Sequence, residues 1–199
     1  MGMSLWLVPP RDVTAKLRNI MDMKTPSARS PSSFPHFQSH ITLCTVPSST
    51  DVSELCAAIP KDQLAVPVTF KAVEVGQKYF TSVYVTVHHR GDLDALRGIL
   101  RSKLGAQAIP PFYHVSLFYI DDSEPDERVK MAHRLREEGR IVEGEDGVAL
   151  DCSPELLSTK LSEEENLVSG FAGAEIWVAV CDGPVPTWVI KDKITLKSP

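Results

Sequence analysis

The sequence repeats one order of elements, a strand, a helix and a second strand, and this repeat limits the possible folds more than any other feature. The first copy consists of SLWLV (4–8), DVTAKLRNIM (12–21) and HITLCTV (40–46). The second copy consists of VYVTV (83–87), DLDALRGIL (92–100) and HVSLFYI (114–120). The copies share their organisation but not their sequence. A chain of this kind can form two related lobes that share a cleft.

The last strand of each copy carries a histidine followed two residues later by a hydroxyl. The pairs are His40 with Thr42 and His114 with Ser116. Because side chains alternate between the two faces of a strand, each histidine shares a face with its hydroxyl. If the two strands are neighbours, two imidazoles and two hydroxyls converge on one cleft. Such a set can bind a small anion while a neutral imidazole accepts a proton from water. These groups suffice for phosphodiester cleavage without a metal ion.

A single motif of this length carries little information in a chain with six histidines. Two copies in apolar strands leave two interpretations open, a catalytic pair or ordinary histidines of the core and surface. Burial of both imidazoles against one cavity would distinguish them. The chain lacks the G-x-S-x-G string of serine hydrolases and has no P-loop string.

Two aromatic residues are candidates to stack on a base or sugar, Trp6 in the opening strand and Tyr119 after the second motif. Packing in the core is the alternative for both. Tyr119 is an odd number of residues from His114, so in an ideal strand it faces away from the cleft. Only a bulge or the end of the strand would return it.

Composition favours one soluble domain that acts on a small molecule. The 199 residues are 43% hydrophobic, which is enough for a substantial core. The net charge of -5 argues against binding of long nucleic acid but is compatible with a small nucleotide. The four cysteines lack C-x-x-C spacing, so we expect reduced thiols, no metal site and no cofactor. We also expect a cytoplasmic monomer without a transmembrane segment, and peripheral Golgi or endomembrane association stays open.

Three segments lie outside the repeat. Residues 24–37 are rich in proline and serine and predict a mobile loop. Residues 67–89 predict two strands around a turn at Gly76-Gln77-Lys78. Residues 139–169 mix acidic runs with glycines, and we expect an acidic loop or insertion there, with an additional hairpin as the alternative.

With these motifs the sequence resembles the two-histidine (2H) phosphoesterase superfamily. More narrowly it resembles the fungal 2',3'-cyclic-nucleotide 3'-phosphodiesterases, through SLWLVPP, SHITLCT, VEVGQKYF, YHVSLFY and IWVAVCDGPVPTW in the expected order. The resemblance covers most of the chain. It implies an α+β fold, a single domain over residues 1–199, in which two intertwined pseudosymmetric lobes with antiparallel sheets form a central cleft and helices lie outside.

The resemblance also implies roles for individual residues. His40 and His114 match the catalytic pair, and the two motif hydroxyls match the groups that hold non-bridging phosphate oxygens. The two aromatic candidates match positions that line the site. The chain departs from many relatives in one respect, since Ser39 and Tyr113 replace the proline that often precedes the motif histidine.

The implied activity is metal-independent hydrolysis of small cyclic phosphates. The expected substrates are 2',3'-cyclic nucleotides, giving nucleoside 2'-phosphates, and ADP-ribose 1'',2''-cyclic phosphate, a by-product of tRNA splicing. An RNA-end phosphodiesterase or a 2'-5' RNA ligase-like enzyme is one alternative, and a non-catalytic nucleotide-binding module is another. The sequence does not assign the general base and the general acid between the two histidines.

Overall fold

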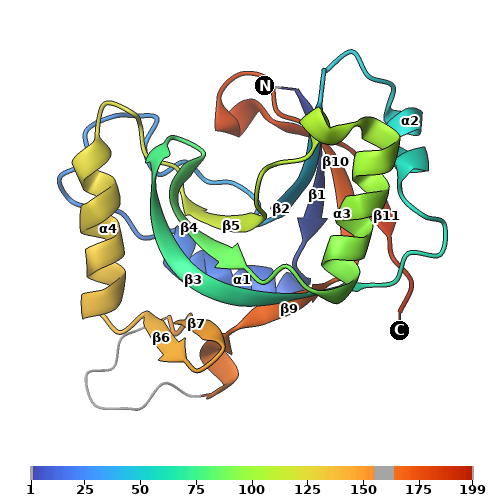
Figure 1. Ribbon diagram of the computed structural model, residues 1–199. Helices are drawn as coiled ribbons and strands as arrows, with labels where there is room; N and C mark the ends of the chain where they lie inside the picture. The colour runs from blue at the N-terminus through green and yellow to red at the C-terminus, as the bar shows by residue number, and fades with distance from the viewer. Residues whose placement is uncertain (1, 155–163, 199) are drawn as a thin grey trace.

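Eight strands form one strongly curled antiparallel sheet in the order β11-β10-β1-β2-β5-β4-β3-β9 (Figure 1). The coordinates are a computed structural model, and they describe residues 2–154 and 164–198. The strands of this sheet are β1 (Met3–Val8), β2 (Ile41–Val46), β3 (Val66–Lys78), β4 (Thr81–Val87), β5 (His114–Phe118), β9 (Gly170–Gly173), β10 (Glu175–Val180) and β11 (Val189–Thr195). The sheet divides into two groups of four strands that meet between β2 and β5, which confirms the expected α+β fold.

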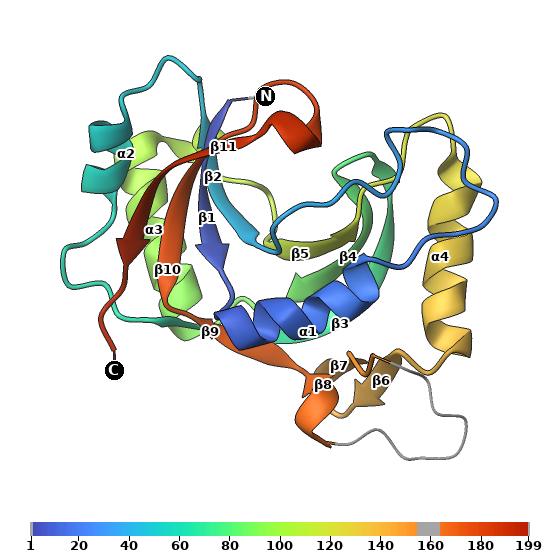
Figure 2. The same cartoon turned by 180° about the vertical axis from the view of Figure 1, so that it is seen from behind.

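Among the described residues, four α-helices lie on the outside of the curled sheet (Figures 1 and 2). They are α1 (Arg11–Met21), α2 (Val52–Ala58), α3 (Gly91–Leu104) and α4 (Pro125–Glu137). Helix α1 contacts β5, and α3 contacts both β2 and β3. Among the described residues, no helix combines the length and the apolar character that a membrane crossing needs.

Strands β2 and β5, where the two groups of strands meet, share a single ladder pair. Ile41 of β2 lies opposite Val115 of β5, and this is the one register pair between these strands. Both side chains are fully buried, as are Leu43 and Leu117 two residues further along each strand. Burial of these four apolar residues confirms the alternation expected from the sequence, with apolar side chains toward the helices and the motif side chains on the opposite face.

Each motif strand carries a β-bulge one residue after its hydroxyl. In β2 the register shift places Trp6 opposite Thr42, and in β5 the corresponding shift places Tyr84 opposite Ser116. A bulge adds one residue to one strand and changes which face the following side chains occupy. The two motifs therefore have the same local geometry, each with an aromatic residue on the neighbouring strand.

The turn expected at Gly76-Gln77-Lys78 is wrong by a few residues. Strand β3 continues through Lys78, and the chain reverses at Tyr79 and Phe80 before β4 begins. The glycine meets a different need, because a Cβ at Gly76 would lie 2.0 Å from the carbonyl oxygen of Thr81. Close approach of two backbones requires glycine in a strand as well as in a turn.

Residues 139–169 contain the hairpin that was the alternative to a loop. Strands β6 (Ile141–Gly144) and β7 (Gly147–Asp151) pair, and β8 (Leu167–Val168) joins β7 to make a small second sheet (Figure 2). Residues 155–163 of this segment lie outside the described residues. Strand β11 was not predicted from the sequence, because its exposed, charged residues have no clear alternation.

The segment 24–37 contains no helix or strand, and its mobility stays a prediction. Two of its backbone amides and the hydroxyl of Ser33 donate hydrogen bonds to the carboxylate of Glu124, at the start of α4. The amide of Phe34 donates to the carbonyl oxygen of Tyr119 at 2.8 Å. The segment thus supports the backbone just beyond the second motif.

Candidate active site

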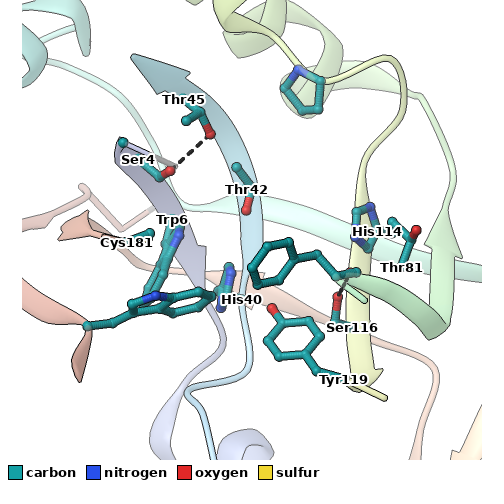
Figure 3. A pocket seen from close by; sticks show the side chains of 14 residues that line it. Ser4, Trp6, His40, Thr42, Thr45, Thr81, His114, Ser116, Tyr119 and Cys181 are labelled. Carbon is teal, nitrogen blue, oxygen red and sulfur yellow. Dashed lines mark hydrogen bonds between the residues drawn. The ribbon is translucent and has the colours of Figure 1, made fainter. Parts of the chain in front are cut away.

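A cavity of about 390 Å³ lies where the two motif strands meet (Figure 3). The side chains that line it come from β1, β2 and β5 and from the connections around β4 and β11. Its lining contains all six residues selected from the sequence, namely His40, Thr42, His114, Ser116, Trp6 and Tyr119. The structure therefore brings together groups that are far apart in the chain, as the side-by-side arrangement of the motif strands requires.

Tyr119 lines the cavity although in an ideal strand its side chain would face away. Two features of β5 explain this. The bulge in β5 precedes it, and the strand ends at Phe118. The ring of Phe37 stacks on Tyr119 with 4.0 Å between ring centroids, and the amide of Phe34 holds the backbone of Tyr119. The tyrosine is 3% exposed, so it is both a packed residue and a wall of the cavity.

The imidazole of His40 is held in a defined orientation. Its Nδ1 lies 2.6 Å from the carbonyl oxygen of Gln38, and its ring stacks on Trp6 with centroids 3.9 Å apart. A carbonyl only accepts, so Nδ1 carries the hydrogen and Nε2 of the neutral ring keeps its lone pair. Burial lowers the pKa of His40 from 6.5 to about 4, against the stabilising effect of the Gln38 carbonyl, and a charge on His114 lowers this pKa further.

The second imidazole is oriented by aromatic packing instead. The ring of His114 lies edge-on to Tyr84 at 5.0 Å and beside Phe112 at 5.2 Å. Its Nδ1 is buried and has no hydrogen-bond partner among the described residues. Burial lowers the pKa of His114 as well. Both imidazoles are therefore mainly neutral at pH 7 before a substrate binds.

The charge on one imidazole affects the protonation of the other. A positive charge on His114 lowers the pKa of His40, so the pair accepts one proton more readily than two. Neither lysine nor arginine is among the described residues that line the cavity. A bound anion would favour protonation of one imidazole, because opposite charge nearby raises the pKa of histidine. The site can then present one imidazolium and one neutral imidazole.

Hydroxyl groups add neutral donors to this cavity. Ser116 Oγ donates to the carbonyl oxygen of Phe80 at 3.1 Å, whereas Thr42 is half-buried on the opposite strand (Figure 3). The hydroxyls of Ser4 and Thr45 lie 2.9 Å apart at the same cavity. A hydroxyl can turn its hydrogen to a new acceptor, so both motif hydroxyls can donate to phosphate oxygens.

Two aromatic residues at the cavity were missed by the sequence reasoning. Phe80, between β3 and β4, is 38% exposed and lies 5.7 Å from Trp188 between ring centroids. Trp188 also approaches Trp6 at 5.7 Å, and Phe80 approaches Tyr119 at 5.3 Å. Both missed residues belong to strings that carried the resemblance, VEVGQKYF and IWVAVCDGPVPTW. The four rings form an aromatic wall suited to a planar ring.

A reactive cysteine and a metal centre are two other kinds of site to consider among the described residues. Cys181 lines the cavity, and burial raises the pKa of its thiol to about 11, so a thiolate is strongly disfavoured there. Within residues 2–154 and 164–198, no three histidine, cysteine, aspartate or glutamate residues are grouped to hold a metal ion. The imidazoles and hydroxyls at the cavity can transfer protons and bind an anion.

Comparisons with known proteins show a family and a fold. A family model described as "cyclic phosphodiesterase-like protein" matches residues 1–196. Crystal structures of E. coli LigT complexed with NADP+ (TM-score 0.54) and of a protein described as a phosphoesterase (TM-score 0.52) share the fold at 12% identity. The alignments cover 98% of this chain with 97% of the first chain and 98% of the second. No curated protein sequence matches the chain at a significant level.

Proposed function

The chain belongs to the cyclic phosphodiesterase-like protein family, and from that premise we propose that its cavity hydrolyses small 2',3'-cyclic nucleotides to nucleoside 2'-phosphates. One observation carries the proposal: both motif imidazoles and both motif hydroxyls line a single cavity. In this proposal His40 and His114 are the catalytic residues, and no metal ion takes part. The aromatic wall would hold the base or the sugar.

The reaction balances with these groups alone. The neutral imidazole takes a proton from water while the water oxygen forms a bond to phosphorus. The imidazolium gives its proton to the ribose 3' oxygen as the P–O3' bond breaks, which leaves the phosphate on the 2' oxygen. Each proton transfer of this kind contributes about 10²–10⁴-fold in rate. The orientation of the bound cyclic phosphate determines which of His40 and His114 faces the water.

The motif hydroxyls would hold the non-bridging oxygens. Thr42 and Ser116 occupy equivalent places on the two strands, so they can reach the phosphate from opposite sides. Ser116 must turn its hydrogen from the Phe80 carbonyl toward the phosphate, and this exchange offsets part of the binding gain. Charge would select the substrate type, because the described residues that line the cavity include no lysine or arginine, and such a lining suits a singly charged diester better than a doubly charged monoester.

The proposal also includes a second substrate, its product and its source. ADP-ribose 1'',2''-cyclic phosphate is the second proposed substrate, with ADP-ribose 1''-phosphate as its product and tRNA splicing as its source. The neutral lining of the cavity favours a small nucleotide over an RNA end, whose binding relies on basic residues. A cytoplasmic location and a monomeric state complete the proposal.

The test is hydrolysis of 2',3'-cyclic AMP in excess EDTA, with the phosphomonoester product identified. We expect turnover to yield the 2'-phosphate, and His40→Ala and His114→Ala each to lower kcat by at least ~10²-fold. His133→Ala is the matched control, because His133 is exposed on α4 and outside the cavity lining. Loss of activity in EDTA would overturn the metal-free reaction. Full activity in either motif variant would overturn the catalytic pair.

A further inference from the structure

The segment 24–37 reaches the start of α4 and then returns to β2 beside the aromatic wall (Figure 2). Near its end Phe37 stacks on Tyr119 with 4.0 Å between ring centroids. A backbone carbonyl of the segment accepts a hydrogen bond from the Tyr79 hydroxyl at 2.9 Å, and the Tyr79 ring lies 4.9 Å from Phe80. The segment therefore supports two of the four rings of the wall, although none of its residues, all of which the structure describes, lines the cavity.

Phe34 of this segment has a left-handed backbone conformation, with a φ of 57°. Within the described part of the chain it is the one residue other than glycine with a positive φ. The Cβ atom makes this conformation unfavourable, so it persists only where the surroundings hold it. In this conformation the Phe34 amide donates to the carbonyl oxygen of Tyr119 at 2.8 Å, and its ring packs edge-on against Phe118 at 5.8 Å. A strained residue thus joins the segment to the end of β5.

The side chain of Glu124 holds the turn that leads into this strained residue. Its Oε1 accepts from the amides of Arg29 at 2.5 Å and Ser30 at 3.0 Å, and its Oε2 accepts from the Ser33 hydroxyl at 2.7 Å. The Ser33 oxygen accepts in turn from the amide of Asp121 at 3.0 Å. The Ser33 hydroxyl and then the Arg29 amide hold the pKa of Glu124 below its usual value. One carboxylate therefore accepts from three donors of the turn.

We propose that Glu124 is a positioning residue of the active site, which keeps Tyr119 against the substrate by holding the segment 24–37 in its strained conformation. This role rests on the function proposed above and extends it. Without the carboxylate, Phe34 can relax to an ordinary backbone conformation, and its amide then leaves the Tyr119 carbonyl. The base or sugar of the substrate loses a fixed surface on which to stack. Because Glu124 lies outside the cavity lining, it affects substrate binding and not proton transfer.

Steady-state kinetics with 2',3'-cyclic AMP test this role. Glu124→Ala is expected to raise KM roughly tenfold, which is the contribution of stacking on one aromatic ring, and to change kcat by less than about twofold. Glu124→Gln should raise KM less, because its amide oxygen still accepts from the backbone amides of Arg29 and Ser30. Asp126→Ala is the matched control, since Asp126 is an exposed carboxylate in the first turn of α4 and makes no hydrogen bond with residues 24–37 in the described structure.

The path through Tyr119 is tested in a Tyr119→Leu background, which lacks the ring. There Glu124→Ala should raise KM by less than about twofold, because two changes that act through one group are not additive. The same rise in KM in both backgrounds would show that Glu124 acts elsewhere and would overturn the proposal. Equal KM values for the wild type and Glu124→Ala would overturn it as well.

Release of the segment is measured separately with trypsin, which cleaves after Arg29. Cleavage at this bond should be at least about fivefold faster in Glu124→Ala than in the wild type and Asp126→Ala, under conditions where circular dichroism shows all three to be folded. Equal cleavage rates would overturn the positioning role even if Tyr119→Leu does not fold. A wild-type protein that fails to hydrolyse 2',3'-cyclic AMP would instead overturn the proposed function, and the trypsin result would still show whether Glu124 holds the segment.

Discussion

Acid should destabilise the protein through His40 in particular. The folded-state pKa of about 4 lies below the usual 6.5, so between these values the unfolded chain binds more protons than the native state. Stability must therefore fall as the pH is lowered from 6.5 to 4. The shift corresponds to about 3 kcal/mol, since one pKa unit is equivalent to about 1.4 kcal/mol. This is a large part of the stability of an ordinary domain.

A comparison of the wild type with a variant that lacks the titrating imidazole isolates the contribution of His40 to the pH dependence of stability. In His40→Asn the side-chain amide can still donate to the Gln38 carbonyl but does not titrate. Urea unfolding of the wild type and the variant at several pH values from 7 to 4 should show the wild type losing about 3 kcal/mol more than the variant. Exposed His133→Asn should follow the wild type. Parallel curves for wild type and His40→Asn would refute the claim that His40 is held neutral by burial.

Three further results are expected. Because burial lowers the pKa of both motif histidines, kcat/KM for 2',3'-cyclic AMP should peak below pH 6.5 and fall about tenfold per unit at higher pH, and a plateau to pH 8 would contradict this. Phe80→Ala and Trp188→Ala should raise KM more than they lower kcat in steady-state kinetics, because they remove the stacking wall and no proton-transfer group. Ser116→Ala should weaken substrate binding, and calorimetry that shows unaltered affinity would count against the phosphate-binding hydroxyl.

Local patterns predicted most of the elements. The helices α1 and α3 follow from apolar spacing, and their buried leucines lie where that spacing puts them. The turn at Gly76 was predicted wrongly, because glycine occurs both in turns and where two backbones approach closely. Only the position of the Thr81 carbonyl opposite Gly76 shows that close approach is the reason here. The exposed edge strand β11 has no buried face along most of its length, so its sequence lacks the alternation that would reveal it.

The candidate site, like the fold, could be predicted in part from local sequence patterns and in part only from the tertiary structure. His40 and His114 could be paired from their motifs because strand alternation is a local property. Phe80 and Trp188 could not be assigned to the cavity, since each lies next to a turn where no simple period fixes the direction of a side chain. Tyr119 depended on a bulge, and a bulge arises from the register between two strands rather than from either sequence alone.

The sequence by itself determined which face of each motif strand carries the histidine and hydroxyl, because that follows from the two-residue period of a strand. Only the tertiary structure decided that β2 and β5 are neighbours through Ile41 and Val115, so that the two faces line one cavity. It alone also decided the protonation of the pair. A pKa depends on the water excluded and the charges placed nearby, and these depend on packing between segments distant in the chain.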